Sequence, residues 1–237
     1  MVAVEAVVLD MDGLLIDTEP VWRVASAAVF AGLGILLSEQ ELLDSTGQPI
    51  EELIPLWRGR SPDGGTPGDG EGARLTDDEV ADLIVDQVIA HVKAEGEPMP
   101  GVMAAVARFR RYGLRLAIAS SSPRRLIDTV LAAARLAHWF QASVSTEEVA
   151  AGKPSPAVYH TVVQRLGVDA SRAIAIEDSS NGLRSASAAG LGVLAVPHPA
   201  FPPAIDALAL ADVVVDSLDD ITPELVASIG HQVGDRA

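Results

Sequence analysis

The sequence predicts an α/β protein built on a doubly wound parallel sheet, and two observations lead to this prediction. Short apolar runs recur along the chain, and such runs are typical of strands that are buried on both faces of a parallel sheet. Helix-like stretches separate these runs beyond residue 98, and this alternation indicates crossover connections between parallel strands. With 237 residues, of which 49% are hydrophobic, the chain is long enough for a full core in one or two domains.

The first strand is expected at residues 3–9, where Glu5 interrupts an otherwise apolar run. Five further strands are expected later in the chain, at residues 114–119, 142–145, 173–176, 192–196 and 212–215. The helices between them are expected at residues 102–111, 123–134, 156–166 and 181–189. Strands and helices are therefore expected to alternate from residue 102 to residue 196.

Residues 17–98 break this rhythm. Val21, Val24 and Ala28, and later Val80, Ile84 and Val88, follow helical spacing, and no strand pattern is evident. Residues 58–76 contain six glycines and two prolines, which predicts a loop. We therefore expect a core domain of residues 1–16 and 99–237, with a helical domain of residues 17–98 inserted after the first strand.

Composition excludes several classes of protein. The formal net charge of −16 disfavours partners that need basic patches, such as nucleic acids and anionic membranes. The absence of cysteine excludes disulfides and thiolate metal sites. No apolar run is long enough to span a bilayer. A signal peptide needs a basic segment before its apolar run, and the first apolar run here has none. We expect a cytoplasmic monomer that binds neither nucleic acid nor membranes.

Two carboxylates follow the first expected strand, at Asp10 and Asp12, and Gly13 allows a sharp turn after them. In an open α/β sheet, ligands bind beyond the carboxyl ends of the strands. One carboxylate there can attack phosphorus while the other handles the proton of the leaving oxygen. Taken alone, such a pair favours the structural alternative, a turn with two solvated aspartates.

The whole run from Asp10 to Glu19, DMDGLLIDTE, is more specific. It resembles the first signature of the haloacid dehalogenase-like (HAD) hydrolases, in the branch of β-phosphoglucomutase and the sugar-phosphate phosphatases. The resemblance implies a Rossmann-like core with a small helical cap that closes over the site. It also implies that Asp10 is the nucleophile, that Asp12 is the general acid and base, and that Met11 lies with them against the phosphate.

Two later motifs extend the resemblance to the phosphate. Hydroxyl and N–H groups before a helix make an anion site, and Ser120 matches the phosphate-binding residue of the family, with Ser121 beside it. Lys153, in the run GKPSP, matches the lysine that contacts both nucleophile and phosphate. A lysine in that place stabilises charge on a transferring phosphoryl group. A polar turn and an exposed lysine are the structural alternatives.

The fourth motif, Glu177-Asp178, follows an expected strand and suits a hard divalent cation. The resemblance implies Mg²⁺ held by Asp10, Asp178 and the backbone carbonyl of Asp12, with Glu177 as a nearby or additional ligand. The structural alternative is an acidic helix N-terminus, which the helix dipole favours by itself.

Together these motifs predict a Mg²⁺-dependent phosphatase that hydrolyses small phosphorylated metabolites, sugar or sugar-alcohol phosphates, through an aspartyl-phosphate. The main alternative is a phosphosugar isomerase of the β-phosphoglucomutase type. The cap signature of that enzyme has an arginine shortly after a glycine, and none follows Gly47 closely here, although Arg124 remains a candidate for a distal phosphate. Dehalogenation and ligand binding without turnover are further alternatives.

Overall fold

The computed structural model describes residues 4–46, 48–59 and 75–234. Residues 60–74, which make up most of the expected loop, and Gly47 lie outside the described residues. The chain divides into two compact units, Met1–Asp17 with Gly96–Ala237, and Thr18–Glu95. That these units act as the two expected domains stays a prediction, and each is described here by itself.

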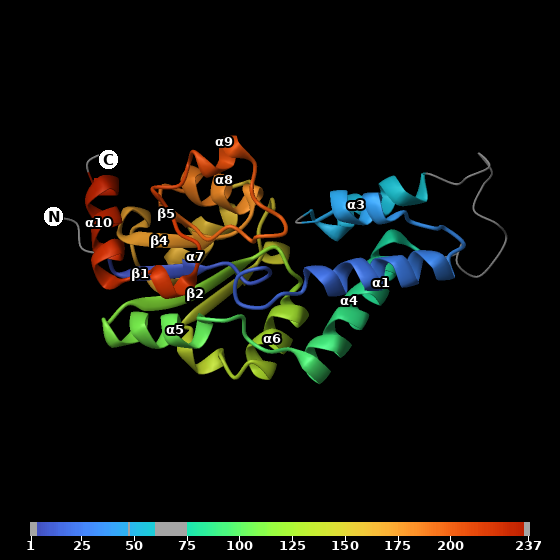
Figure 1. The fold of residues 1–237 in the computed structure, drawn as a ribbon, viewed down its shortest axis with the longest axis horizontal. Coiled ribbons are helices and arrows are strands. Elements are labelled where there is room, and N and C mark those ends of the chain that lie inside the picture. Colours follow the sequence, from blue (N-terminus) through green and yellow to red (C-terminus); the bar gives the residue numbers. More distant parts are fainter. Residues whose placement is uncertain (1–3, 47, 60–74, 235–237) are drawn as a thin grey trace. The chain divides into compact units, whose positions relative to one another are not determined.

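The larger unit contains a six-stranded sheet in the order β3-β2-β1-β4-β5-β6, and every neighbouring pair is parallel. Figure 1 labels β1, β2, β4 and β5 of this sheet. The strands are β1 Ala6–Leu9, β2 Arg115–Ser120, β3 Ala142–Ser145, β4 Ala173–Glu177, β5 Gly192–Ala195 and β6 Val213–Val214. The strand order reverses at β1, as in doubly wound sheets. The predicted fold class is therefore confirmed.

Helices cover both faces of the sheet because alternate residues of each strand point to opposite sides. Ala6 and Val8 of β1 share one core cluster with α7, Ala157–Leu166, and α8, Ser180–Ala188. The other face packs against α5, Val102–Arg111, and α10, Pro223–Gly234. The remaining elements are α6 Arg124–Ala133, α9 Ile205–Leu208, and the 3₁₀ helices η2 Ala137–Trp139, η3 Thr146–Glu148, η4 Ala170–Arg172 and η5 Leu218–Asp220.

Sequence patterns did not predict α9 or α10. In α10 the buried Val226 and Ile229 lie three residues apart, which is a helical spacing. Two apolar positions are too few to distinguish a helix from a loop. The four residues of α9 are too few for a periodic pattern. Tertiary packing, and not local pattern, fixes both helices.

Helices are the only regular elements among the described residues of the smaller unit, as the sequence predicted for this stretch. It contains α1 Glu19–Gly32, α2 Glu39–Asp44, α3 Ile50–Arg58 and α4 Asp77–Glu95, with α1 and α3 packed against α4. Phe30 of α1 and Trp57 of α3 meet edge to face, with ring centroids 5.1 Å apart. Ser38 and Glu41 form a capping box that satisfies N–H groups at the start of α2.

Strand register brings the chemical motifs to one edge of the sheet. Leu9, the last residue of β1, pairs with Ile118 of β2 and with Ile176 of β4. Asp10 therefore leaves the sheet beside the ends of both neighbouring strands. Because all the strands are parallel, their carboxyl ends form one rim, and the candidate site lies there.

Candidate active site

Lys153 joins the ends of the three central strands. Its Nζ lies 2.7 Å from Asp10 Oδ1 and 2.6 Å from Glu177 Oε1, and it donates to the carbonyl of Ala119 at 2.9 Å. Burial by itself lowers the pKa of Lys153, but the charges of Asp10 and Glu177 outweigh this and raise the pKa above its usual value. Lys153 is therefore a fixed, charged ammonium beside Asp10.

Glu177 is fully buried at the end of β4, and three side chains hold it. Its Oε1 accepts hydrogen bonds from Lys153 and from the phenol of Tyr159, and its Oε2 accepts from Ser179 Oγ at 3.3 Å. Burial raises the pKa of Glu177, the charge of Asp10 raises it further, and Lys153 opposes both effects. Burial and the Glu177 charge likewise raise the pKa of the Tyr159 phenol, so it remains a donor.

Three buried carboxylates fit a divalent cation. Asp10, Glu177 and Asp178 each offer one oxygen, and these oxygens all lie within 4.8 Å of one another. The Lys153 ammonium balances one of the three, so negative charge is left for a cation to neutralise. The surroundings preserve this space, because a Cβ at Gly13 would overlap the Asp178 carboxylate. Oxygen ligands of this kind suit hard divalent cations.

Asp12 has different surroundings from Asp10. Gly13, at φ +76°, turns the chain immediately after it, and the Gly13 N–H donates to Ile16 O at 2.8 Å. The Asp12 carboxylate is only partly buried, and its Oδ2 accepts a hydrogen bond from Ser122 Oγ and a longer one, 3.5 Å, from Ser120 Oγ. A partly exposed carboxylate held by hydroxyls can exchange protons with a ligand, which is the behaviour of a general acid or base.

The serine loop, residues 120–122 at the end of β2, has both buried and exposed members. Ser120 is fully buried, and its Oγ accepts the Ser122 N–H at 3.0 Å, whereas Ser121 is exposed. Met11 contributes a fully buried side chain, so a part in phosphate binding would rest on its backbone. The structure thus brings Asp10, Asp12 and the serine loop to one rim, as expected.

Sequence reasoning did not identify Ser122 as the partner of Asp12, or Tyr159 as the partner of Glu177. For Ser122 the signal was present, since it belongs to the same serine run as Ser120. Tyr159 gave no signal, because one tyrosine in an amphipathic helix reads as core packing. Only the fold places its hydroxyl against Glu177.

A sequence model of the haloacid dehalogenase-like hydrolases matches residues 4–190. The chain belongs to this family. The match spans β1, the inserted helical unit, the loop before α7 that carries Lys153, and Asp178 directly after β4, so all four motifs of this HAD hydrolase lie within it. A divalent metal is a general requirement of HAD hydrolases, and the buried carboxylates provide a place for one.

Relatives of this HAD hydrolase include named phosphatases. Hexitol phosphatase B of Escherichia coli is 36% identical over 218 residues, which are 92% of this chain and 94% of the relative. The plasmid-encoded CbbY of Cupriavidus necator is 34% identical over 204 residues, which are 81% of this chain and 78% of the relative. Among solved structures, CbbY of Rhodobacter sphaeroides in complex with phosphate has a TM-score of 0.79 at 28% identity, with 92% and 96% of the two chains covered.

Proposed function

We propose that this HAD hydrolase is a Mg²⁺-dependent phosphatase of sugar or sugar-alcohol monophosphates. The observation that carries the proposal is the contact between Lys153 and Asp10, which fixes a nucleophilic carboxylate beside a permanent positive charge. Relatives named hexitol phosphatase support the substrate class. One solved CbbY structure contains xylulose 1,5-bisphosphate, which also supports a phosphorylated sugar.

The reaction needs two steps. A carboxylate oxygen of Asp10 attacks phosphorus, the bond from phosphorus to the ester oxygen breaks, and Asp12 gives its proton to the departing alcohol. Asp12 then takes a proton from water as the water oxygen attacks phosphorus. The bond from phosphorus to Asp10 breaks, which releases phosphate and restores both side chains. Lys153, Ser120 and Ser121 bind the phosphoryl oxygens throughout.

Mg²⁺ held by Asp10, Asp178 and the Asp12 carbonyl, with Glu177 as a nearby or further ligand, would supply charge stabilisation for the transferring phosphoryl group. The chain's own residues prepare that place. Ser179 and Tyr159 hold the Glu177 carboxylate, and Gly13 leaves room beside Asp178.

No helix within the described ranges is both long and apolar enough to cross a membrane.

A phosphatase is favoured over a mutase because Arg124 has other partners. A mutase must hold a second phosphate, and Arg124 was the candidate for it. Its Nη1 donates to Ser143 Oγ at 2.7 Å, its Nη2 to Ser143 O at 2.9 Å, and its Nε to Glu148 Oε1 at 3.0 Å. A guanidinium engaged in this way is poorly suited to grip a substrate. Gly47, where the mutase signature was sought, lies outside the described residues.

The test is phosphate release from a panel of hexitol phosphates, hexose 6-phosphates and xylulose 1,5-bisphosphate, with Mg²⁺ or EDTA. We expect release with Mg²⁺ from at least one monophosphate and none in EDTA. Asp10→Asn should lose at least about 10³-fold in kcat, since the nucleophile is gone. Asp206→Asn, the same substitution at a carboxylate 72% exposed in the same unit, is the control and should keep full activity. Undiminished release in EDTA would falsify the proposal.

A further inference from the structure

The serine loop that contacts Asp12 is held from outside by three hydrogen bonds. Ser145 Oγ donates to the carbonyl of Ser122 at 2.7 Å, and Thr146 Oγ1 donates to the carbonyl of Ser121 at 3.0 Å. The Arg124 N–H, which follows the loop, donates to Glu147 Oε2 at 2.7 Å. All three partners belong to one short segment at the end of β3, so that segment fixes the backbone of the loop.

Glu148 fixes that segment in turn. Its Oε1 accepts the Ser145 N–H at 2.9 Å, which closes a capping box at the start of η3. Arg124 donates to the same oxygen through Nε and Nη2, and Arg165 donates to Oε2 through Nη2 at 2.7 Å. One carboxylate thus takes four donors from α6, α7 and the end of β3.

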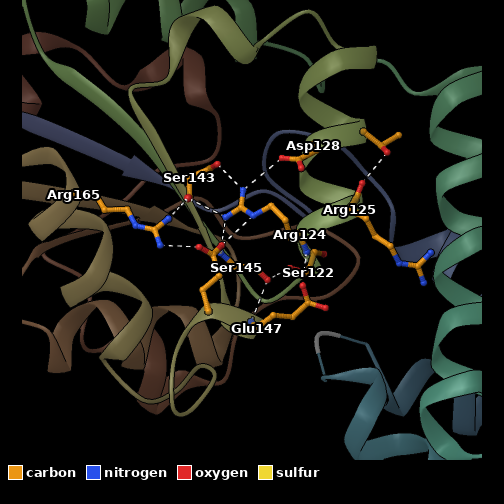
Figure 2. Close-up of polar contacts among 10 residues, drawn as sticks. Ser122, Arg124, Arg125, Asp128, Ser143, Ser145, Glu147 and Arg165 are labelled. Carbon is orange, nitrogen blue, oxygen red and sulfur yellow. Dashed lines mark hydrogen bonds and ion pairs between the residues drawn. The ribbon is translucent and has the colours of Figure 1, made fainter.

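Both arginines also hold the preceding strand (Figure 2). Arg124 and Arg165 each donate to the carbonyl of Ser143, at 2.9 Å from either side. An exposed ion pair alone contributes little, but several donors fixed on one carboxylate form a rigid network. The side chain of Glu148 is 28% exposed and lies in neither the metal cluster nor the phosphate loop. Its contacts therefore serve geometry and not direct chemistry.

We propose that Glu148 is a positioning residue for Asp12, acting through Ser145 and Ser122. The inference rests on the proposed function, in which Asp12 is the general acid and base. The path has three contacts: Glu148 to the Ser145 N–H, Ser145 Oγ to the Ser122 carbonyl, and Ser122 Oγ to Asp12 Oδ2. Loss of the first contact releases the loop, and the Ser122 hydroxyl then no longer aims the Asp12 carboxylate.

The test is a double-mutant cycle with Glu148→Gln and Ser122→Ala. Glutamine keeps the size of the side chain but sets an NH₂ donor against the donors of an arginine. We expect each single variant to lose about tenfold or more in kcat, the scale of one hydrogen bond to a charged group. KM should stay within about threefold, because proton transfer and not binding is impaired. The kcat of the double variant should be no lower than that of the less active single variant, since both changes act on one path.

The matched control is Glu5→Gln, which breaks the ion pair between Glu5 and Arg172 in the same unit. Glu5 is 32% exposed, close to the 28% of Glu148, but it precedes β1, away from the rim. Its kcat should equal that of the unmodified protein. If Glu148→Gln behaves like this control, or if its loss multiplies with that of Ser122→Ala, the inference is wrong. If Glu148→Gln does not fold, Arg165→Gln takes its place in the cycle with the same two outcomes.

Crystal structures of the variants give a readout that is independent of turnover. In Glu148→Gln we expect the Ser122 Oγ to Asp12 distance to exceed roughly 3.5 Å, beyond hydrogen bonding, while Glu5→Gln keeps the contact. An unchanged contact in Glu148→Gln overturns the inference. A parent protein that releases no phosphate would instead overturn the proposed function, and the structures would still decide the role of Glu148.

Discussion

Lys153 carries its charge where water hardly reaches it. Its side chain is 3% exposed, and its two acidic partners, Asp10 and Glu177, are 9% and 0% exposed. Buried charges of this kind are tolerated because they neutralise one another and because further donors complete the hydrogen bonding. The contacts that hold Asp10 therefore also make the rim sensitive to the loss of Lys153, because the two carboxylates would stay buried without their counter-charge.

Replacing Lys153 by methionine should consequently affect stability as well as turnover. In EDTA we expect the free energy of unfolding to fall by about 3–5 kcal/mol, because Asp10 and Glu177 are left buried without their ammonium partner. Denaturant titration at pH 7 measures this. Lys93→Met is the matched control, since Lys93 is exposed on α4 and its loss should change the free energy by less than about 0.5 kcal/mol. Equal effects of the two changes would contradict the electrostatic account.

At the scale of elements, the sequence predicted those strands, helices and motif residues that a local run of residues marks. Asp10, Ser120 and Asp178 were singled out because each lies in a motif at the end of an expected strand, and parallel strands bring such ends to one rim. Lys153 was singled out by its GKPSP motif alone. For Ser122 the serine run drew attention to the residue but not to its partner Asp12, which is 110 positions away. The contact of Tyr159 with Glu177 gave no signal at all, because it depends on where the folded helix places one hydroxyl. The partners of Arg124 likewise needed the structure, since sequence alone left this arginine available for a substrate.

The η3 element gives a prediction about pH. Burial by itself raises the pKa of Glu148, but hydrogen bonds from Arg124, the Ser145 backbone and Arg165 outweigh it and lower the pKa to about 2. A depressed pKa means that Glu148 stabilises the fold above its unfolded pKa, near 4.5, and that this contribution is lost as pH falls toward 2. Glu147 and Asp128 are the other carboxylates that contact Arg124.

Glu148→Gln should therefore lower the free energy of unfolding at pH 7 by about 1–3 kcal/mol, a range that allows for partial exposure. The difference from the parent protein should shrink between pH 4.5 and pH 2, because the parent carboxylate then becomes neutral as well. Urea titrations of both proteins at pH 7, 4 and 3 measure this. A difference that stays constant over that range would show that shape and not charge accounts for the contribution.

At the scale of the whole molecule, the net charge of −16 opposes an anionic substrate and the compact state alike. Three of the carboxylates behind this charge are buried together at the rim, against one ammonium from Lys153. Two effects of added Mg²⁺ must therefore be separated. General screening of the surface charge needs only ionic strength, whereas site binding needs the carboxylates of the rim.

Mg²⁺ should raise the Tm of the parent protein well beyond NaCl of equal ionic strength. A ligand at about 100 times its Kd adds about 2.7 kcal/mol to the native state, which for a chain of this size corresponds to a Tm rise of about 5–10 °C. Asp178→Asn keeps the shape of the side chain and the surface charge nearly intact but replaces a charged ligand by a neutral amide oxygen, so its Tm should gain much less from Mg²⁺ than that of the parent protein. Thermal unfolding followed by circular dichroism in both salts makes the comparison. If Asp178→Asn gains as much from Mg²⁺ as the parent protein does, the ion acts by screening or at another site, and the rim is not where it binds.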